Sequence, residues 1–146
     1  MRIHAFHHLY QHRLSLSTRP FKARGCKVVR CEYCKIEQGH CICEHQPDIK
    51  TNVATMLILS DNEVLKPSNT GRLIVDTVKD SHVYLWHRTE PNPEMLAVLK
   101  DEKYQPVIVF PEDYTDDKSR VVQDLPAMRD SNKTLLLIFI DGSWRE

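Results

Sequence analysis

The chain has 146 residues, of which 41% are hydrophobic and 27% charged, and this suits one compact globular domain with room for a small appended module. No apolar run approaches the ~20 residues that a membrane-spanning helix needs, and histidines stand where a secretory signal would be apolar. We therefore expect a cytoplasmic protein with no membrane partner.

The formal net charge is zero, but the two signs are segregated along the chain. Residues 1–50 hold nine basic and four acidic residues, whereas residues 51–146 hold 11 basic and 16 acidic residues. A neutral protein can bind a polyanion when its positive charge is local in this way. A basic segment that is merely solvated would have the same composition, so charge alone leaves both interpretations open.

Residues 1–24 form a basic, histidine-containing N-terminal arm with little apolar periodicity, which predicts either a loose helix or disorder. Its first twelve residues include four histidines whose spacing matches no regular set of metal ligands. We expect these histidines to be solvated and not to form a metal site: His4, His7, His8 and His12.

Residues 25–46 form a cysteine-rich module. Cys31 and Cys34 make a CxxC pair, and Cys41 and Cys43 follow within the next nine residues. Four thiolates at such spacing suit a tetrahedral Zn²⁺, and a segment this short needs the metal to fold. We therefore predict structural zinc without an open coordination position. An iron–sulfur cluster or free thiols remain alternatives, whereas disulfides fit an odd, clustered set of cysteines poorly.

Three further side chains near this module could bind the metal, but they fit less well. Cys26 lies five residues before Cys31, which is too far for a knuckle, and His40 and His45 are interpreted as solvated neighbours. Basic residues surround the module and alternate with the aromatic residues Phe21 and Tyr33. Because cations bind phosphates and aromatic rings stack on bases, we predict RNA binding by Arg19, Lys22, Arg24, Lys27 and Arg30.

From residue 51 to residue 146 the pattern alternates between apolar strands and helices, which predicts an α/β domain with a mostly parallel sheet and flanking helices. Two helices are expected, one after the capping residues 68–70 and one starting at Asn92-Pro93. Residues 111–133 are polar, which is typical of a long loop. The predicted strands are Val53–Ser60, Val83–Trp86, Pro106–Phe110 and Thr134–Ile140.

An open parallel sheet binds ligands at the carboxyl ends of its strands. We expect four segments to meet there, namely residues 66–72, 86–91, 110–114 and 141–145. The turn Ser68–Arg72 could attract an anion or could simply cap a helix, and Phe110-Pro111 could be an ordinary turn. Asp141-Gly142-Ser143-Trp144 is harder to explain structurally, although Asp141 could cap a following helix.

Several of these motifs together resemble the DTW-domain family, and within it the bacterial tRNA-uridine aminocarboxypropyltransferases. The resemblance runs from about Arg19 to the end of the chain, with Ser143 in place of the threonine of the family's name motif. The motifs that carry it are Arg19-Pro20-Phe21, Arg24-Gly25, CxxC-x6-CxC, Lys66–Leu73, Trp86-x-Arg88-Thr89-Glu90-Pro91, Val109-Phe110-Pro111 and Asp141-Gly142-Ser143-Trp144.

The resemblance implies a SPOUT-like fold that is incomplete here, because family members continue beyond this motif. It also implies transfer of the 3-amino-3-carboxypropyl group of S-adenosylmethionine to N3 of a tRNA uridine, with release of methylthioadenosine. Under this interpretation Asp141 is the catalytic base, Arg72 and Arg88 bind the cofactor carboxylate, and Trp144 either stacks on a base or joins the core. The expected cofactor-binding residues are Ser68, Asn69, Thr70, Gly71, Arg72, Arg88, Phe110, Pro111, Gly142, Ser143 and Trp144.

Two other functions remain open at this point. Because the chain stops at the Asp141–Trp144 motif, it could be a non-catalytic, zinc-containing RNA-binding module. A generic α/β nucleotide-binding or signalling domain is less consistent, since it gives the cysteines and the basic arm no purpose. Neither the oligomeric state nor the uridine that is modified can be read from the sequence.

Overall fold

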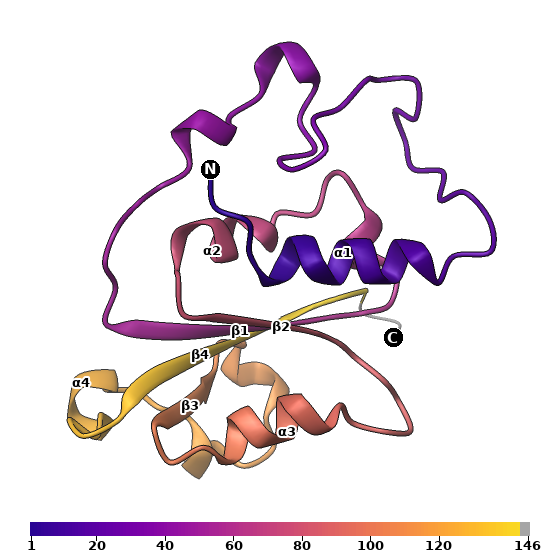
Figure 1. The fold of residues 1–146 in the computed structure, drawn as a ribbon. Helices are drawn as coiled ribbons and strands as arrows, with labels where there is room; N and C mark the ends of the chain where they lie inside the picture. Colours follow the sequence, from indigo (N-terminus) through magenta and orange to yellow (C-terminus); the bar gives the residue numbers. More distant parts are fainter. Residues whose placement is uncertain (144–146) are drawn as a thin grey trace.

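The structure is a computed structural model that describes residues 1–143. Its centre is a four-stranded, all-parallel sheet with the order β2-β1-β4-β3 (Figure 1). The parallel α/β architecture predicted from the sequence is confirmed. The strands are β1 (Val53–Leu59), β2 (Ser81–Leu85), β3 (Tyr104–Ile108) and β4 (Thr134–Asp141), and the helices are α1 (Ala5–Ser15), α2 (Arg72–Thr77), α3 (Pro93–Lys100) and α4 (Leu125–Met128).

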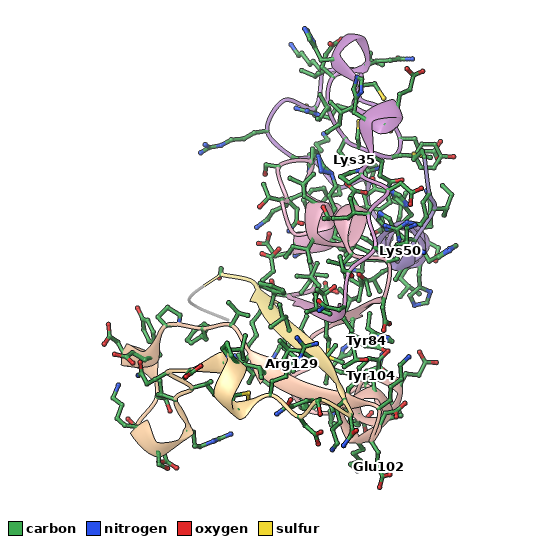
Figure 2. The ribbon with its side chains drawn as sticks, turned by 90° about the vertical axis from the view of Figure 1, so that its left-hand side faces the viewer. Lys35, Lys50, Tyr84, Glu102, Tyr104 and Arg129 are labelled. Atoms are coloured by element: carbon green, nitrogen blue, oxygen red, sulfur yellow. The ribbon has the colours of Figure 1, made fainter. Side chains whose placement is uncertain are left out.

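Both faces of the central strands are covered, as the continuous apolar runs require. Alternate side chains of β1 point to opposite faces of the sheet, so Leu57 and Leu59 pack with one cluster and Ala54 and Met56 with the other. Helices α1 and α2 lie over the first face and α3 over the second (Figure 1). The α3 side also holds Tyr104, whose hydroxyl donates to Asp80, and Tyr84 beside it (Figure 2).

The N-terminal segment is helical from Ala5 to Ser15, which decides between the two states predicted for it. The one fully buried side chain of this helix is Phe6. Phe6 is 3% exposed and packs into the cluster formed by β1, β2 and α2, with Leu9 and Tyr10 at its edge. Helix α1 therefore contributes to the core of the α/β domain, and the chain leaves the sheet surface only after it.

Three elements differ in detail from the sequence prediction, namely β2, β3 and the predicted loop, and β2 begins at Ser81, two residues earlier than predicted. Strand β3 begins at Tyr104, two residues earlier than predicted, and includes Pro106. Proline lacks the N–H that a central strand would donate, and β3 tolerates it because it is an edge strand. Residues 111–133 contain two 3₁₀ turns and the short helix α4 within the predicted loop. Across residues 1–143, no helix has the length and apolarity needed to cross a membrane.

Candidate functional site

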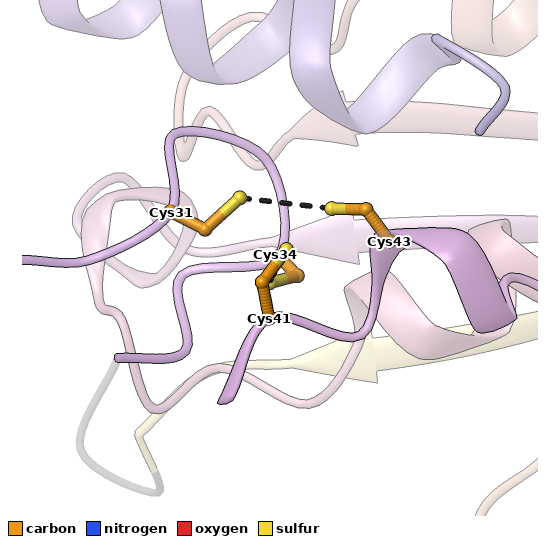
Figure 3. Close-up of side chains that lie close together, drawn as sticks. All are labelled: Cys31, Cys34, Cys41 and Cys43. Carbon is orange, nitrogen blue, oxygen red and sulfur yellow. Dashed lines mark hydrogen bonds between the residues drawn. The ribbon is translucent and has the colours of Figure 1, made fainter. Parts of the chain in front are cut away.

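The four cysteines predicted as metal ligands converge in space (Figure 3). The Sγ atoms of Cys31 and Cys43 lie 3.6 Å apart, and those of Cys34 and Cys41 lie 3.8 Å apart. A zinc ion bound by four thiolates at about 2.3 Å places neighbouring sulfurs about 3.8 Å from one another. The sulfurs are therefore spaced for a tetrahedral ion, and the cluster could hold a metal such as zinc.

The thiols also have the electrostatics of a site that needs a cation. Burial opposes ionisation of Cys31, but the backbone N–H groups of Cys34 and Tyr33 outweigh it and lower its pKa to about 6. Burial and the neighbouring thiols raise the pKa of Cys43 well above its ordinary value. The Cys31 thiolate therefore forms readily while Cys43 resists ionisation, because burial and an adjacent negative charge both oppose it. A divalent metal would supply the charge that lets all four ionise.

A backbone turn over residues 31–36 holds the two cysteines of the CxxC pair in place. The Cys31 N–H donates to the Ile36 carbonyl at 2.8 Å, and the Lys35 N–H donates to the Cys31 carbonyl at 3.1 Å. Lys35 has a left-handed backbone (φ 59°) that closes the turn, and its ammonium sits 3.6 Å from the centre of the Tyr10 ring of α1. The cysteine module is thus fixed to α1 by a cation–π contact.

Cys26 is exposed and is not among the thiols that group together in the described part of the chain. The five predicted RNA-binding side chains lie along the same segment, and four of them are exposed or partly exposed: Arg19, Lys22, Arg24 and Lys27. Arg30 is partly buried, and its guanidinium donates to the Lys35 carbonyl at 3.1 Å. Arg30 therefore supports the metal-binding turn as well as adding positive charge.

A second site lies at the carboxyl ends of the two central strands. Asp141 is the last residue of β4, and the turn 66–71 follows β1, its neighbour in the sheet. The Asn69 side-chain amide donates to Asp141 Oδ2 at 2.8 Å. Gly71 lies against the same carboxylate, so closely that a Cβ there would be 2.7 Å from Asp141 Oδ2. The predicted meeting of these two segments, 72 residues apart in sequence, is therefore present.

This site contains buried polar atoms that the protein itself leaves unsatisfied. Arg72 and Asn69 are each 7% exposed. Within residues 1–143, the Arg72 Nε and Nη1 atoms and the Asn69 Oδ1 atom have no hydrogen-bond partner. Buried donors of a charged group that lack hydrogen-bond partners cost free energy, about 1–3 kcal/mol each or more. The Arg72 atoms are donors and the Asn69 Oδ1 atom is an acceptor, so together they mark a place for a ligand that brings both an anionic acceptor and a hydrogen-bond donor.

The remaining predicted ligand residues lie further out. Ser68 and Thr70 are exposed on either side of the buried Asn69, and Gly142 and Ser143 are exposed after β4. Arg88 is exposed in the loop after β2, and Phe110 and Pro111 are exposed after β3. Because β2 and β3 are opposite edges of the sheet, these two loops begin on either side of the central pair of strands. Trp144 lies outside the described residues.

The family model described as "DTW domain" matches residues 28–146, which is most of the chain. The chain belongs to the DTW-domain family. Its match begins just before the cysteine cluster and includes both the Asn69–Arg72 turn and Asp141. Membership is consistent with a role in tRNA modification. No solved structure matches the chain.

Sequence reasoning missed one polar cluster of this DTW domain, which lies between α1, α2 and the end of the cysteine module. Asp76 Oδ1 lies 2.7 Å from His4 Nε2 and accepts from Gln46 Nε2 at 3.0 Å. Burial raises the pKa of Asp76, but these two contacts and the charges of His4 and Arg72 outweigh it, so its pKa is below the ordinary value. The expectation that the histidines of the N-terminal arm are solvated is wrong for His4, which is 7% exposed, because its contact with Asp76 depends on tertiary packing that leaves no local signal.

The same cluster brings metal-ligand types together, since donor atoms of His4, His7 and Asp76 lie within 4.8 Å of one another. The His4 and His7 rings are stacked, with centroids 4.0 Å apart and planes inclined by 13°. Imidazole binds a metal in its ring plane at about 2.0–2.1 Å. No point at that distance lies in both of two nearly parallel planes, so we interpret the cluster as a hydrogen-bonded hub and not as a metal centre.

Proposed function

We propose that this DTW domain transfers the 3-amino-3-carboxypropyl group of S-adenosylmethionine to N3 of a uridine in tRNA and that methylthioadenosine is the by-product. The observation that carries the proposal is the buried guanidinium of Arg72, whose Nε and Nη1 atoms have no hydrogen-bond partner within residues 1–143, next to the turn that holds the Asn69–Asp141 pair. Bound S-adenosylmethionine supplies an activated carbon attached to a sulfonium, so the protein does not need to activate the electrophile.

The side chains can be given separate roles in this reaction. Uracil N3 becomes a nucleophile only when it loses its proton, and the carboxylate of Asp141 is the group proposed to accept that proton. Asn69 donates to one oxygen of Asp141, which orients the carboxylate and leaves its other oxygen for the base. Arg72 would bind the carboxylate of the transferred group, which holds the reacting carbon near Asp141. The proposed outer contacts are Ser68, Thr70, Arg88, Phe110, Pro111, Gly142, Ser143 and Trp144.

The tRNA would bind along the cysteine module. Arg19, Lys22, Arg24 and Lys27 lie there at or near the surface, next to the zinc-binding turn. Zinc would serve as a structural ion that holds the loop in shape, because four cysteines leave it no open position. Binding through phosphates is salt-dependent, and each contact that is lost lowers the salt slope by about one.

Mass spectrometry of the products tests the proposal directly. Zinc-loaded protein is incubated with unmodified tRNA and S-adenosylmethionine, and we expect methylthioadenosine together with a uridine that carries the added group. Release of S-adenosylhomocysteine would indicate methyl transfer and refute the proposed reaction. The Asp141→Asn variant should lower turnover by about 10²–10⁴-fold. Salt-sensitive tRNA binding without any binding of S-adenosylmethionine would support the non-catalytic RNA-binding alternative.

A further inference from the structure

The guanidinium of Arg72 lies near an acid, Asp76, with which it forms no ion pair within residues 1–143. Arg72 and Asp76 are four residues apart on α2 and therefore lie on the same helix face, about 5–6 Å apart at their Cβ atoms. The charge of Arg72 is close enough to contribute to the lowered pKa of Asp76. Within residues 1–143 no hydrogen bond reaches the Arg72 Nε or Nη1 atom, although an arginine and an acid at this spacing commonly pair.

The acid is held elsewhere by groups from two other segments. Asp76 Oδ1 is engaged by His4 Nε2 from the segment that leads into α1, and by Gln46 Nε2 from the end of the cysteine module. Gln46 is itself fixed, because its Oε1 accepts from the Arg2 N–H and its Nε2 also donates to the Arg2 carbonyl at 3.3 Å. The Arg2 guanidinium donates to the Val75 and Asp76 carbonyls at 2.9 Å, which secures the N-terminus to α2.

We infer that Gln46 is a positioning residue, which together with His4 holds Asp76 away from Arg72, so that the Arg72 guanidinium stays open for the ligand carboxylate. The inference rests on the proposed function, since it concerns how the same site binds S-adenosylmethionine. When Gln46 is removed, Asp76 keeps one of its two side-chain partners and can turn toward Arg72. The internal ion pair then competes with the ligand.

Gln46 also lies next to the metal cluster in the sequence. Gln46 follows Cys43 by three residues, and its N–H contacts the Cys43 carbonyl at 3.4 Å. Gln46 therefore joins the last cysteine of the metal cluster to α2, because its backbone N–H donates to Cys43 and its side chain donates to Asp76. The ordering of the metal module and the open state of Arg72 are linked through this contact.

Calorimetric titration of S-adenosylmethionine into four zinc-loaded proteins tests the inference: the wild type, Gln46→Ala, Asp76→Asn and the double variant. The Gln46→Ala change should weaken binding about tenfold, a typical size for coupling between sites. Asparagine can still accept hydrogen bonds from His4 and Gln46 but cannot form an ion pair. Asp76→Asn should therefore bind like the wild type, and the double variant should recover the affinity that Gln46→Ala loses.

Recovery of affinity in the double variant would show that Gln46 acts by holding Asp76 and is not merely needed for folding. Gln11→Ala is a matched control, because Gln11 also donates to an acid of another segment, Glu32, at 3.4 Å, but lies away from α2. It should leave the affinity unchanged. Unchanged binding by Gln46→Ala, or a double variant as weak as Gln46→Ala, would overturn the inference while the proposed function stands. A wild type that does not bind S-adenosylmethionine would overturn both.

Discussion

Replacement of Gly71 by alanine tests the packing of the strand-end site. Gly71 has φ −56° and ψ −31°, a conformation that any residue adopts at the start of a helix. On backbone grounds alone, alanine should stabilise the protein by about 0.4–1 kcal/mol, because it restricts the unfolded chain. The added Cβ, however, would lie 2.7 Å from Asp141 Oδ2, 3.0 Å from Leu57 Cδ2 and 3.1 Å from Asn69 Oδ1.

None of these neighbours can move away easily. Leu57 is 1% exposed in the core, and Asp141 belongs to the central strand β4. Overpacking of this kind costs about 1–3 kcal/mol, and a displaced Asp141 also weakens its bond to Asn69, which is worth about 1 kcal/mol. We therefore expect Gly71→Ala to lower the free energy of unfolding by about 1–3 kcal/mol and to weaken binding of S-adenosylmethionine.

Urea unfolding followed by fluorescence measures this effect as a lower midpoint with an unchanged slope. Gly39→Ala is the control, because its Cβ would meet only the carboxylate end of Glu37, at 3.1 Å, on the surface. Its effect should stay within about 0.5 kcal/mol. In an Asp141→Ala background the cost of Gly71→Ala should shrink. A Gly71→Ala protein as stable as the wild type would show that the turn and Asp141 are not packed as described.

Three further predictions concern the metal cluster, α1 and α3. Cys34→Ser should lower zinc content well below one ion per chain, measured by elemental analysis, whereas Cys26→Ser should not, since the exposed Cys26 lies outside the cluster in the described part of the chain. Burial, and next the charge of His4, lowers the pKa of His7 from 6.5 to about 4. Between pH 6.5 and about pH 4, His7 is therefore protonated in the unfolded chain and neutral in the folded chain. Stability should fall as the pH drops through this window, by about 3 kcal/mol in total. In unfolding curves at several pH values His7→Asn should lose this part of the slope, and an unchanged slope would contradict the assignment. The Asn92 side chain accepts from the Glu94 and Met95 N–H groups at the start of α3, so Asn92→Ala should cost about 1 kcal/mol in thermal unfolding. No loss there would show that the cap is not stabilising.

The elements best predicted from the sequence are those with strong local signals. The apolar runs at residues 53–60 and 134–140 became the two central strands, and Asn92-Pro93 marked the start of α3. The spacing of the four cysteines predicted their convergence, because a CxxC turn brings its own sulfurs together. The contact between the Asn69–Arg72 turn and Asp141 followed from a general property of parallel sheets, since turns after adjacent strands share one edge.

Other features depend on tertiary contacts that leave no local pattern. Helix α1 docks through Phe6, and a single buried side chain leaves no apolar periodicity in the sequence. The burial of Arg72 could not be predicted, because arginine at a helix start is usually solvated. The strand order places the loop that carries Arg88 on one flank of the site and the loop that carries Phe110 on the other, and spacing along the chain does not specify that order.

The proposed function depends above all on one claim. It is that the guanidinium of Arg72 and the carboxylate of Asp141 belong to one binding site for S-adenosylmethionine. A crystal structure of the zinc-loaded protein with this ligand measures it most directly. We predict the ligand at the carboxyl ends of β1 and β4, with its carboxylate within hydrogen-bonding distance of Arg72 and its amino-acid arm facing Asp141. A ligand bound elsewhere on the domain, with the Arg72 Nε and Nη1 atoms still buried and without a partner, would contradict this prediction.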